Sequence, residues 1–187
     1  KGGAIYCSNS LIFICKSAFI NNTLCNFVIS ASMECSAFGG SCYFSKSKAS
    51  LLDCKFINNT INFSLLNYTD YSLIRIYGGA VYSINEKQLL NCTNCTFNDN
   101  NVFIQNNHEK EMAGAVYLTK GALNNCIFND NVAHNGGDIE YNQTQNSQLM
   151  ITNCCFTHQI SKEQKIKSLI YFCLCDKNNP HYRGNAG

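Results

Sequence analysis

The stretch Gly78-Gly79-Ala80-Val81-Tyr82, followed further along by Cys95-Thr96-Phe97-Asn98-Asp99-Asn100, decides the fold because both halves recur along the chain. The first half is usually a glycine pair followed by small and apolar residues and often a tyrosine. Its second glycine returns as Gly3, Gly40, Gly79, Gly114 and Gly137. The second half has the form Cys-x-Phe-x-x-Asn, and its phenylalanine returns as Phe19, Phe56, Phe97, Phe128 and Phe156. Such an internal repeat indicates units that bury their apolar side chains against neighbouring copies.

The spacing within the repeat favours strands over helices. From the second glycine to the phenylalanine there are always 14 to 19 residues, whereas the segment from the phenylalanine to the next glycine pair absorbs insertions. Apolar and polar residues alternate with period two, as at Ala80, Tyr82 and Ile84, and turn-forming Gly-Gly, Asn-Asn and Asn-Asp pairs separate the runs. A repeat of about 23 residues, at ~3.3 Å each, can form one three-sided turn of short strands.

The sequence therefore predicts an all-β, single-stranded parallel β-helix of about five rungs with loop insertions. We expect residues 1–160 to form this repeat domain and residues 161–187 to form a C-terminal rung or an irregular tail. Helical periodicity is conceivable only over residues 161–173, which could equally be an irregular insert. Because the chain starts inside a repeat, we interpret it as a fragment of a longer protein.

In such a coil, equivalent residues stack on one another. The repeat phenylalanines should form an internal aromatic column. The cysteines two residues before them should line the same interior as small apolar groups: Cys54, Cys95, Cys126 and Cys154. The asparagines three residues after them should turn the chain and form an amide ladder: Asn22, Asn59, Asn100 and Asn131. The repeat glycines fit positions of positive φ or of close contact between rungs.

Composition limits the classes of function. The formal net charge is +2 and only 14% of the residues are charged, which argues against a nucleic-acid partner. No window is apolar enough for a membrane-spanning helix. Of the 13 cysteines, six form close pairs, at Cys92-x-x-Cys95, Cys154-Cys155 and Cys173-x-Cys175. The first pair lacks a well-placed second pair for zinc, and the other two lie far downstream. We therefore expect neither a metal nor another cofactor, and we expect the cysteines in repeat register to be buried and unreactive.

The two recurring patterns resemble the GGAI and FxxN repeats of the polymorphic outer membrane protein family. Gly2-Gly3-Ala4-Ile5 and Gly78-Gly79-Ala80-Val81 match the first, and Phe56 to Asn59 and Phe97 to Asn100 are among the matches to the second. The resemblance implies a right-handed parallel β-helix of the pectin-lyase-like kind, displayed at a cell surface and often adhesive. The chain is richer in cysteine than the bacterial pattern and carries no recognisable β-barrel translocator. Similar repeats occur in surface proteins of parasitic protists.

Catalysis by a polysaccharide-active enzyme, like pectate lyase or polygalacturonase, is the alternative. Asp99 and Asp130 recur two residues after the column phenylalanine and could form a carboxylate pair, although Asp is ordinary in Asn-rich turns. The segment 67–70 is only superficially like the polygalacturonase Asn-Thr-Asp signature. The four histidines share no register, and we expect them in solvent-exposed loops: His108, His134, His158 and His181.

We favour a non-catalytic, secreted or surface-displayed protein that binds protein or glycan on host cells or other extracellular surfaces. The variable segments 23–38, 60–77 and 101–112 should project to one side of the coil as contact loops. The aromatic residues Phe63, Tyr68 and Tyr71 in the second of these segments are the candidate contacts. Seven Asn-x-Ser/Thr sequons are compatible with secretion: Asn21, Asn58, Asn62, Asn67, Asn91, Asn94 and Asn142.

Overall fold

A computed structural model describes most of the repeat domain and two short pieces of the segment that follows it. The described residues are 2–28, 35–65, 74–85, 89–105, 111–133, 137–142, 148–157, 170–173 and 183–186. Within these ranges the structure contains β-strands and no helix. All strand pairs are parallel except the pair formed by the two C-terminal strands. The predicted all-β parallel β-helix is confirmed.

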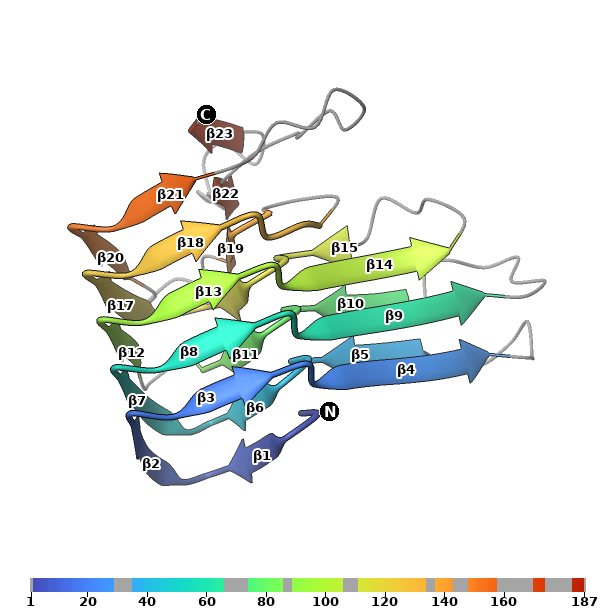
Figure 1. Ribbon diagram of the computed structural model, residues 1–187, viewed down its shortest axis with the longest axis horizontal. Helices are drawn as coiled ribbons and strands as arrows, with labels where there is room; N and C mark the ends of the chain where they lie inside the picture. The colour runs from blue at the N-terminus through green and yellow to red at the C-terminus, as the bar shows by residue number, and fades with distance from the viewer. Residues whose placement is uncertain are drawn as a thin grey trace, which may run out of the picture.

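Three parallel sheets form the walls of the coil (Figure 1). The first sheet contains, in spatial order, β1 (Ile5–Ser8), β6 (Cys42–Ser45), β11 (Val81–Ile84), β16 (Val116–Leu118), β19 (Ile139–Asn142), β22 (Ile170–Cys173) and β23 (Arg183–Ala186). The second sheet contains β2 (Leu11–Cys15), β7 (Lys48–Leu52), β12 (Leu90–Thr93), β17 (Gly121–Asn124) and β20 (Leu149–Thr152). The third sheet contains β3 (Ala18–Ile20), β8 (Lys55–Ile57), β13 (Thr96–Asn98), β18 (Ile127–Asn129) and β21 (Cys155–Thr157).

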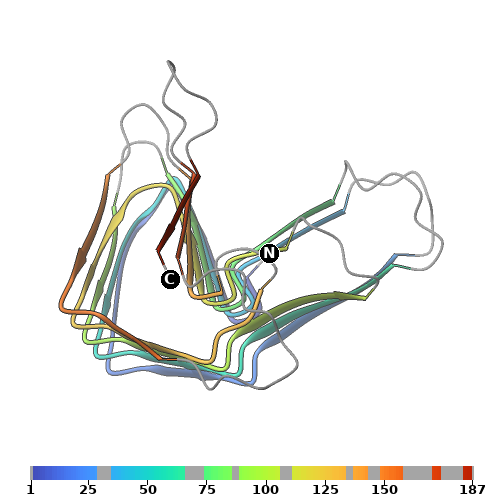
Figure 2. The same ribbon diagram turned by 90° about the horizontal axis from the view of Figure 1, so that it is seen from above.

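Two further sheets lie beside the coil and were not predicted. One contains β4 (Thr23–Val28), β9 (Thr60–Leu65) and β14 (Asn101–Gln105), and the other contains β5 (Cys35–Phe38), β10 (Ile74–Tyr77) and β15 (Glu111–Met112). Seen from above, they form two arms that project from one side of the three-walled coil (Figure 2). We call these six strands the wing. The expectation that segments 23–38, 60–77 and 101–112 are loops is therefore wrong for the strands within them.

The five predicted rungs are present, since β2, β7, β12, β17 and β20 each belong to one of them. In the C-terminal segment, β22 adds a sixth parallel strand to the first sheet, and β23 pairs with it in antiparallel fashion. The helical alternative for residues 161–173 is thus wrong for residues 170–173, which form a strand. The rest of that stretch lies outside the described residues.

The phenylalanine column occupies the centre of the third sheet. Phe19, Phe56, Phe97, Phe128 and Phe156 stack in chain order, with successive ring centroids 4.8–5.0 Å apart and ring planes within 11° of parallel. The three middle rings are fully buried. Parallel in-register pairing places strands about 4.8 Å apart, so identical rings meet face against face along the coil.

The asparagine ladder runs beside this column and satisfies the polar atoms of its buried amides. The Nδ2 group of Asn100 donates to the carbonyl oxygen of Phe56, at 3.0 Å, and to Oδ1 of Asn131, at 2.9 Å. Its own Oδ1 accepts hydrogen bonds from the backbone N–H and the Nδ2 group of Asn59. The same pattern links Asn22 to Asn59, and at the other end Asn131 donates to Oδ1 of the buried Asp138, at 2.8 Å.

The ladder asparagines do not themselves turn the chain, so this part of their predicted role is wrong. The positive φ at this bend belongs to the residue just before each ladder asparagine. These residues are Asn21, Asn58, Asp99 and Asp130, with φ between 51° and 57°. A left-handed backbone is easiest for Gly, Asn and Asp, so Asn and Asp at this position suit the bend.

The repeat glycines hold the position where rungs approach most closely. A Cβ atom on Gly79 would lie 2.0 Å from the carbonyl oxygen of Gly114, and one on Gly40 would lie 1.8 Å from that of Gly79. Gly3 and Gly114 meet the same obstacle. Gly137 is buried and supplies the carbonyl oxygen that Gly114 faces.

The asparagine ladder can be tested with Asn100→Asp. A carboxylate still accepts from Asn59, but it has no hydrogen to donate to Phe56 and Asn131 and places a negative charge in a buried site. We expect the free energy of unfolding at pH 7 to fall by about 3 to 5 kcal/mol. Because burial raises the pKa of the new carboxyl in the folded state, the loss should shrink at acidic pH, measured by urea denaturation at pH 4 to 7.

Asn62→Asp is the matched control, because Asn62 is exposed on β9. It should change the free energy of unfolding by no more than about 0.5 kcal/mol. Equal stability of the two variants at neutral pH would contradict a structural role for the ladder.

Candidate functional site

The wing is built by the segments between each phenylalanine and the next glycine pair. The strands β4, β9 and β14 pair in register, so Leu24, Ile61 and Val102 form one column. Ile61 and Val102 are buried, as are Ala37 of β5 and Ile76 of β10 in the facing arm. Alternation of these buried positions with exposed ones such as Asn62 and Arg75 gives each wing sheet one inner and one outer face.

A row of tyrosines on the outer side of the first sheet joins the wing to the coil. Tyr6, Tyr43, Tyr82 and Tyr117 stack with ring centroids 5.0–5.2 Å apart. Phe38 of β5 lies 4.7 Å from Tyr82, and Tyr77 of β10 lies 4.7 Å from Tyr117, again between ring centroids. Tyr43, Tyr82 and Tyr117 are consequently buried although they point away from the coil interior.

Glu140 occupies the next position in this tyrosine row. It pairs in register with Tyr117 below it and with Tyr171 above it. The Glu140 side chain is only 3% exposed, and its Oε2 atom has no hydrogen-bond partner. Burial raises the pKa of the Glu140 carboxyl to about 8, so the group is mostly protonated at neutral pH.

Polar groups surround the end of the row. Asn142 on the same strand donates from Nδ2 to the hydroxyl oxygen of Tyr117, at 2.8 Å. Burial and the charge of Glu140 raise the pKa of Tyr77, and the nearby Arg75 lowers it in part. Arg75 is exposed on β10. This junction thus combines aromatic faces, an amide and a neutral carboxyl, with a cation at its edge.

Of the predicted contact aromatics, Phe63 is part of β9, and its side chain lies outside the described part of the chain. Tyr68 and Tyr71 also lie outside it, as do segment 67–70 and all four histidines. What the structure does show is where the intervening segment starts and ends. It leaves β9 and returns at β10, the middle strands of the two wing sheets.

The predicted carboxylate pair stands at a bend instead of in a cleft of facing acids. Asp99 and Asp130 follow the paired residues Asn98 and Asn129, so they occupy equivalent positions on adjacent rungs. Both have positive φ, and Asn21 and Asn58 hold the same position in the first two rungs. The recurrence of aspartate therefore has a conformational cause, the left-handed bend.

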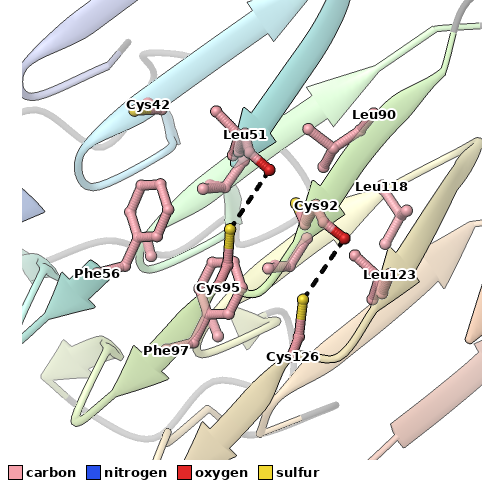
Figure 3. Packing of buried hydrophobic residues seen from close by; sticks show 14 of the residues in the cluster. Cys42, Leu51, Phe56, Leu90, Cys92, Cys95, Phe97, Leu118, Leu123 and Cys126 are labelled. Carbon is pink, nitrogen blue, oxygen red and sulfur yellow. Dashed lines mark hydrogen bonds between the residues drawn. The ribbon is translucent and has the colours of Figure 1, made fainter. Parts of the chain in front are cut away.

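The repeat cysteines line the coil interior (Figure 3). Cys54, Cys95 and Cys126 are fully buried, while Cys154 is partly buried in the last described rung. The Sγ atom of Cys95 lies 3.4 Å from the carbonyl oxygen of Thr93 and 3.5 Å from that of Leu51 in the preceding rung. In the first rung Ser17 takes this position, and its hydroxyl donates to the carbonyl oxygen of Cys15. Cys15 itself is exposed at the end of β2.

These thiols are unpaired, and burial keeps Cys54, Cys95 and Cys126 away from reagents in solution. All ten cysteines whose side chains are described are unpaired. Burial raises the pKa of Cys42 to about 12 and also raises the pKa of Cys54, whereas hydrogen bonding with the Cys126 thiol lowers the pKa of Cys95 and of Cys154. The protection of Cys95 therefore comes from its burial and not from its pKa. Among the side chains described, no group of three or more His, Cys, Asp or Glu could hold a metal ion. The part of the chain placed in the structure also contains no helix with the length and apolar character needed to cross a membrane.

Thiol modification provides a direct test of this burial. In the native protein an aromatic disulfide reagent should modify the exposed Cys15, Cys25 and Cys155 within minutes. The five buried cysteines should react only after unfolding: Cys42, Cys54, Cys92, Cys95 and Cys126. Peptide mass spectrometry assigns each modified site, and rapid native modification of Cys95 or Cys126 would contradict the closed interior.

The buried carboxyl predicts an unusual dependence of stability on pH. Since the folded-state pKa of Glu140 is raised to about 8, well above an unfolded-state value near 4.3, its contribution is fully present below the latter. That contribution is lost as pH rises toward and through 8, with a slope of up to about 1.4 kcal/mol per pH unit. Urea denaturation of the wild type between pH 5 and 8.5 should show this loss, and Glu140→Gln should flatten the curve. Equal slopes for both proteins would refute the assignment.

Comparison with protein-family models, with curated proteins and with solved structures returned no match to this chain.

Proposed function

We propose that the chain is a secreted or surface-displayed β-helix repeat protein in which a rigid coil presents the wing to extracellular protein or glycan. The observation that supports this most directly is the regular stacking of the wing strands. The strands of three successive inserted segments pair with one another in register. This pairing places the residues at which the connecting segments start and end side by side. A scaffold that positions several adjacent connections suits an extended contact surface.

The packing of the wing on the coil supports the same role. The contacts of Phe38 and Tyr77 with the tyrosine row fix the β5–β10 arm through ring stacking at 4.7 Å. Because the arm is fixed before a partner arrives, binding requires little ordering of the scaffold, and less free energy is lost in forming the complex. The resemblance of the repeats to those of the polymorphic outer membrane proteins is in keeping with adhesion.

The conformation of the recurring aspartates supports binding without catalysis. Asp99 and Asp130, the recurring carboxylates, meet a conformational need at the bend, and Asn fills the same position in other rungs. A hydrolase or lyase would need two acidic or basic groups in different environments around one bond.

Substitution of the candidate aromatics tests the contact surface. Deleting residues 60–77 is unsuitable, because it removes β9 and β10, the middle strands of both wing sheets. Phe63 is left unchanged, because alternation along β9 places it on the same face as the buried Ile61. We expect the double variant Tyr68→Ser, Tyr71→Ser to weaken binding of fluorescent protein to cultured cells at least tenfold, as expected for loss of anchor aromatics. The matched control is Leu11→Ser with Phe13→Ser, which changes exposed apolar residues of β2 on the coil. It should bind like the wild type.

Pretreating the cells with protease or with glycosidase then distinguishes a protein ligand from a glycan ligand. Undiminished binding of the double variant, or no binding by the wild type, would overturn the proposal. Cleavage of polygalacturonate by the wild type that is lost in Asp99→Asn with Asp130→Asn would establish the enzymatic alternative instead.

A further inference from the structure

The sequons fall into two groups in the folded chain. Asn21, Asn58, Asn62 and Asn94 are exposed, whereas Asn91 and Asn142 are half-buried. The amide of Asn142 is also engaged, since it donates to the tyrosine row at Tyr117. Asn67 lies outside the described residues. A glycan on Nδ2 needs open space in front of the amide, and the first group provides it.

The four exposed sequons share one side of the molecule. Asn21 and Asn58 lie at the bend where the third sheet meets the wing, and Asn94 lies at the bend between the second and third sheets. Asn62 lies on β9, where it alternates with the buried Ile61 and so faces away from the inner side of the wing. The third sheet and the β4–β9–β14 arm form a continuous side that faces away from the β5–β10 arm (Figure 2).

We propose that this side carries N-linked glycans, with three glycans distributed over the four exposed sequons; the inference rests on the proposed passage through a secretory pathway. The donor is a lipid-diphosphate-linked oligosaccharide. A bond forms between Nδ2 and the anomeric carbon, the bond from that carbon to the phosphate oxygen breaks, and the lipid diphosphate leaves. Nδ2 gives up one proton to the medium and keeps one N–H.

The limit of three follows from the stacking of Asn21 on Asn58. These residues follow the paired Ile20 and Ile57, so they occupy adjacent rungs about 4.8 Å apart. The Nδ2 group of Asn58 donates to Oδ1 of Asn21, at 2.8 Å. In the folded chain, two oligosaccharides would crowd each other on amides this close, so we expect a folded chain to carry one glycan at this pair. Asn94 contacts Oδ1 of Asp53 at 3.1 Å, a bond that its remaining N–H can keep.

Exposed apolar side chains adjoin these sites. Phe103 is in register with Asn62 and is 55% exposed, and Ile20, next to Asn21, is 52% exposed. The first sugar residue can cover such a surface with its apolar face, which removes it from water. Glycans on this side would leave the outer face of the β5–β10 arm open to a partner.

The test counts glycans on protein made in a eukaryotic host that adds uniform oligomannose chains. Every variant carries Asn67→Gln, so that the count refers to the described residues. Digestion with an endoglycosidase that leaves one N-acetylglucosamine per site allows counting by intact mass, on protein from the cell lysate as well as the medium. We expect at most three per chain. Asn62→Gln and Asn94→Gln should each lower the maximum to two, and Asn91→Gln and Asn142→Gln should leave it at three.

The stacked pair gives the sharpest result. Asn21→Gln alone and Asn58→Gln alone should leave the maximum at three, because the other member accepts the glycan, and the double variant should lower it to two. Four glycans on one chain, a glycan at Asn91 or Asn142, or an empty Asn62 or Asn94 would overturn the inference. Glycan counting involves no partner. Failed cell binding with the expected count would therefore overturn only the proposed function, and a wrong count with intact binding would overturn only this inference.

Discussion

Parallel pairing in register is the constraint on which the structure depends, because it places each side chain directly against its equivalent in the next rung. At a spacing of about 4.8 Å, a column is stable only if its members tolerate contact with themselves. Aromatic rings do so by stacking, amides by donating and accepting along the same line, and thiols by approaching carbonyl oxygens. Like charges do not, which accounts for a chain in which only 14% of residues are charged. The Phe97, Asn100 and Cys95 columns are three chemical solutions to one geometric problem.

Glu140 is a carboxyl side chain in a row that otherwise consists of tyrosines. It stands in the tyrosine row between Tyr117 and Tyr171, in a site whose other members are aromatic. An ionised carboxylate there would be desolvated without a paired cation, so the folded chain favours the neutral acid. The ladder asparagines meet a similar exception differently, since Asn131 reaches the buried Asp138 with a donor N–H. Buried carboxyls are thus accommodated at the upper rungs by protonation or by an amide donor.

The strongly repeated side-chain columns could be predicted from the sequence, whereas the weakly repeated wing strands could not. The phenylalanine, cysteine and asparagine columns could be placed because residues in equivalent positions of a parallel coil must meet. The wing strands were missed because their connecting segments differ in length, although an apolar residue does follow each of the first three ladder asparagines by two positions: Leu24, Ile61 and Val102. Glu140 was missed because a carboxylate breaks the pattern of tyrosines at its position. Counting from Gly137 as from Gly79 places Glu140, and not Tyr141, at the tyrosine position.

The same constraint bears on function. An enzyme that cleaves polysaccharides needs one acid and one base whose surroundings push their pKa values apart. A stacked coil gives equivalent residues nearly equivalent surroundings, so Asp99 and Asp130 share both backbone conformation and position. The rungs differ from one another where the repeat is interrupted. This happens in the segments inserted between the wing strands and at the Glu140 end of the tyrosine row. Recognition of a partner depends on such differences between rungs. The proposed contact surface on the wing would use the part of the architecture that varies between rungs, while the coil beside it stays uniform.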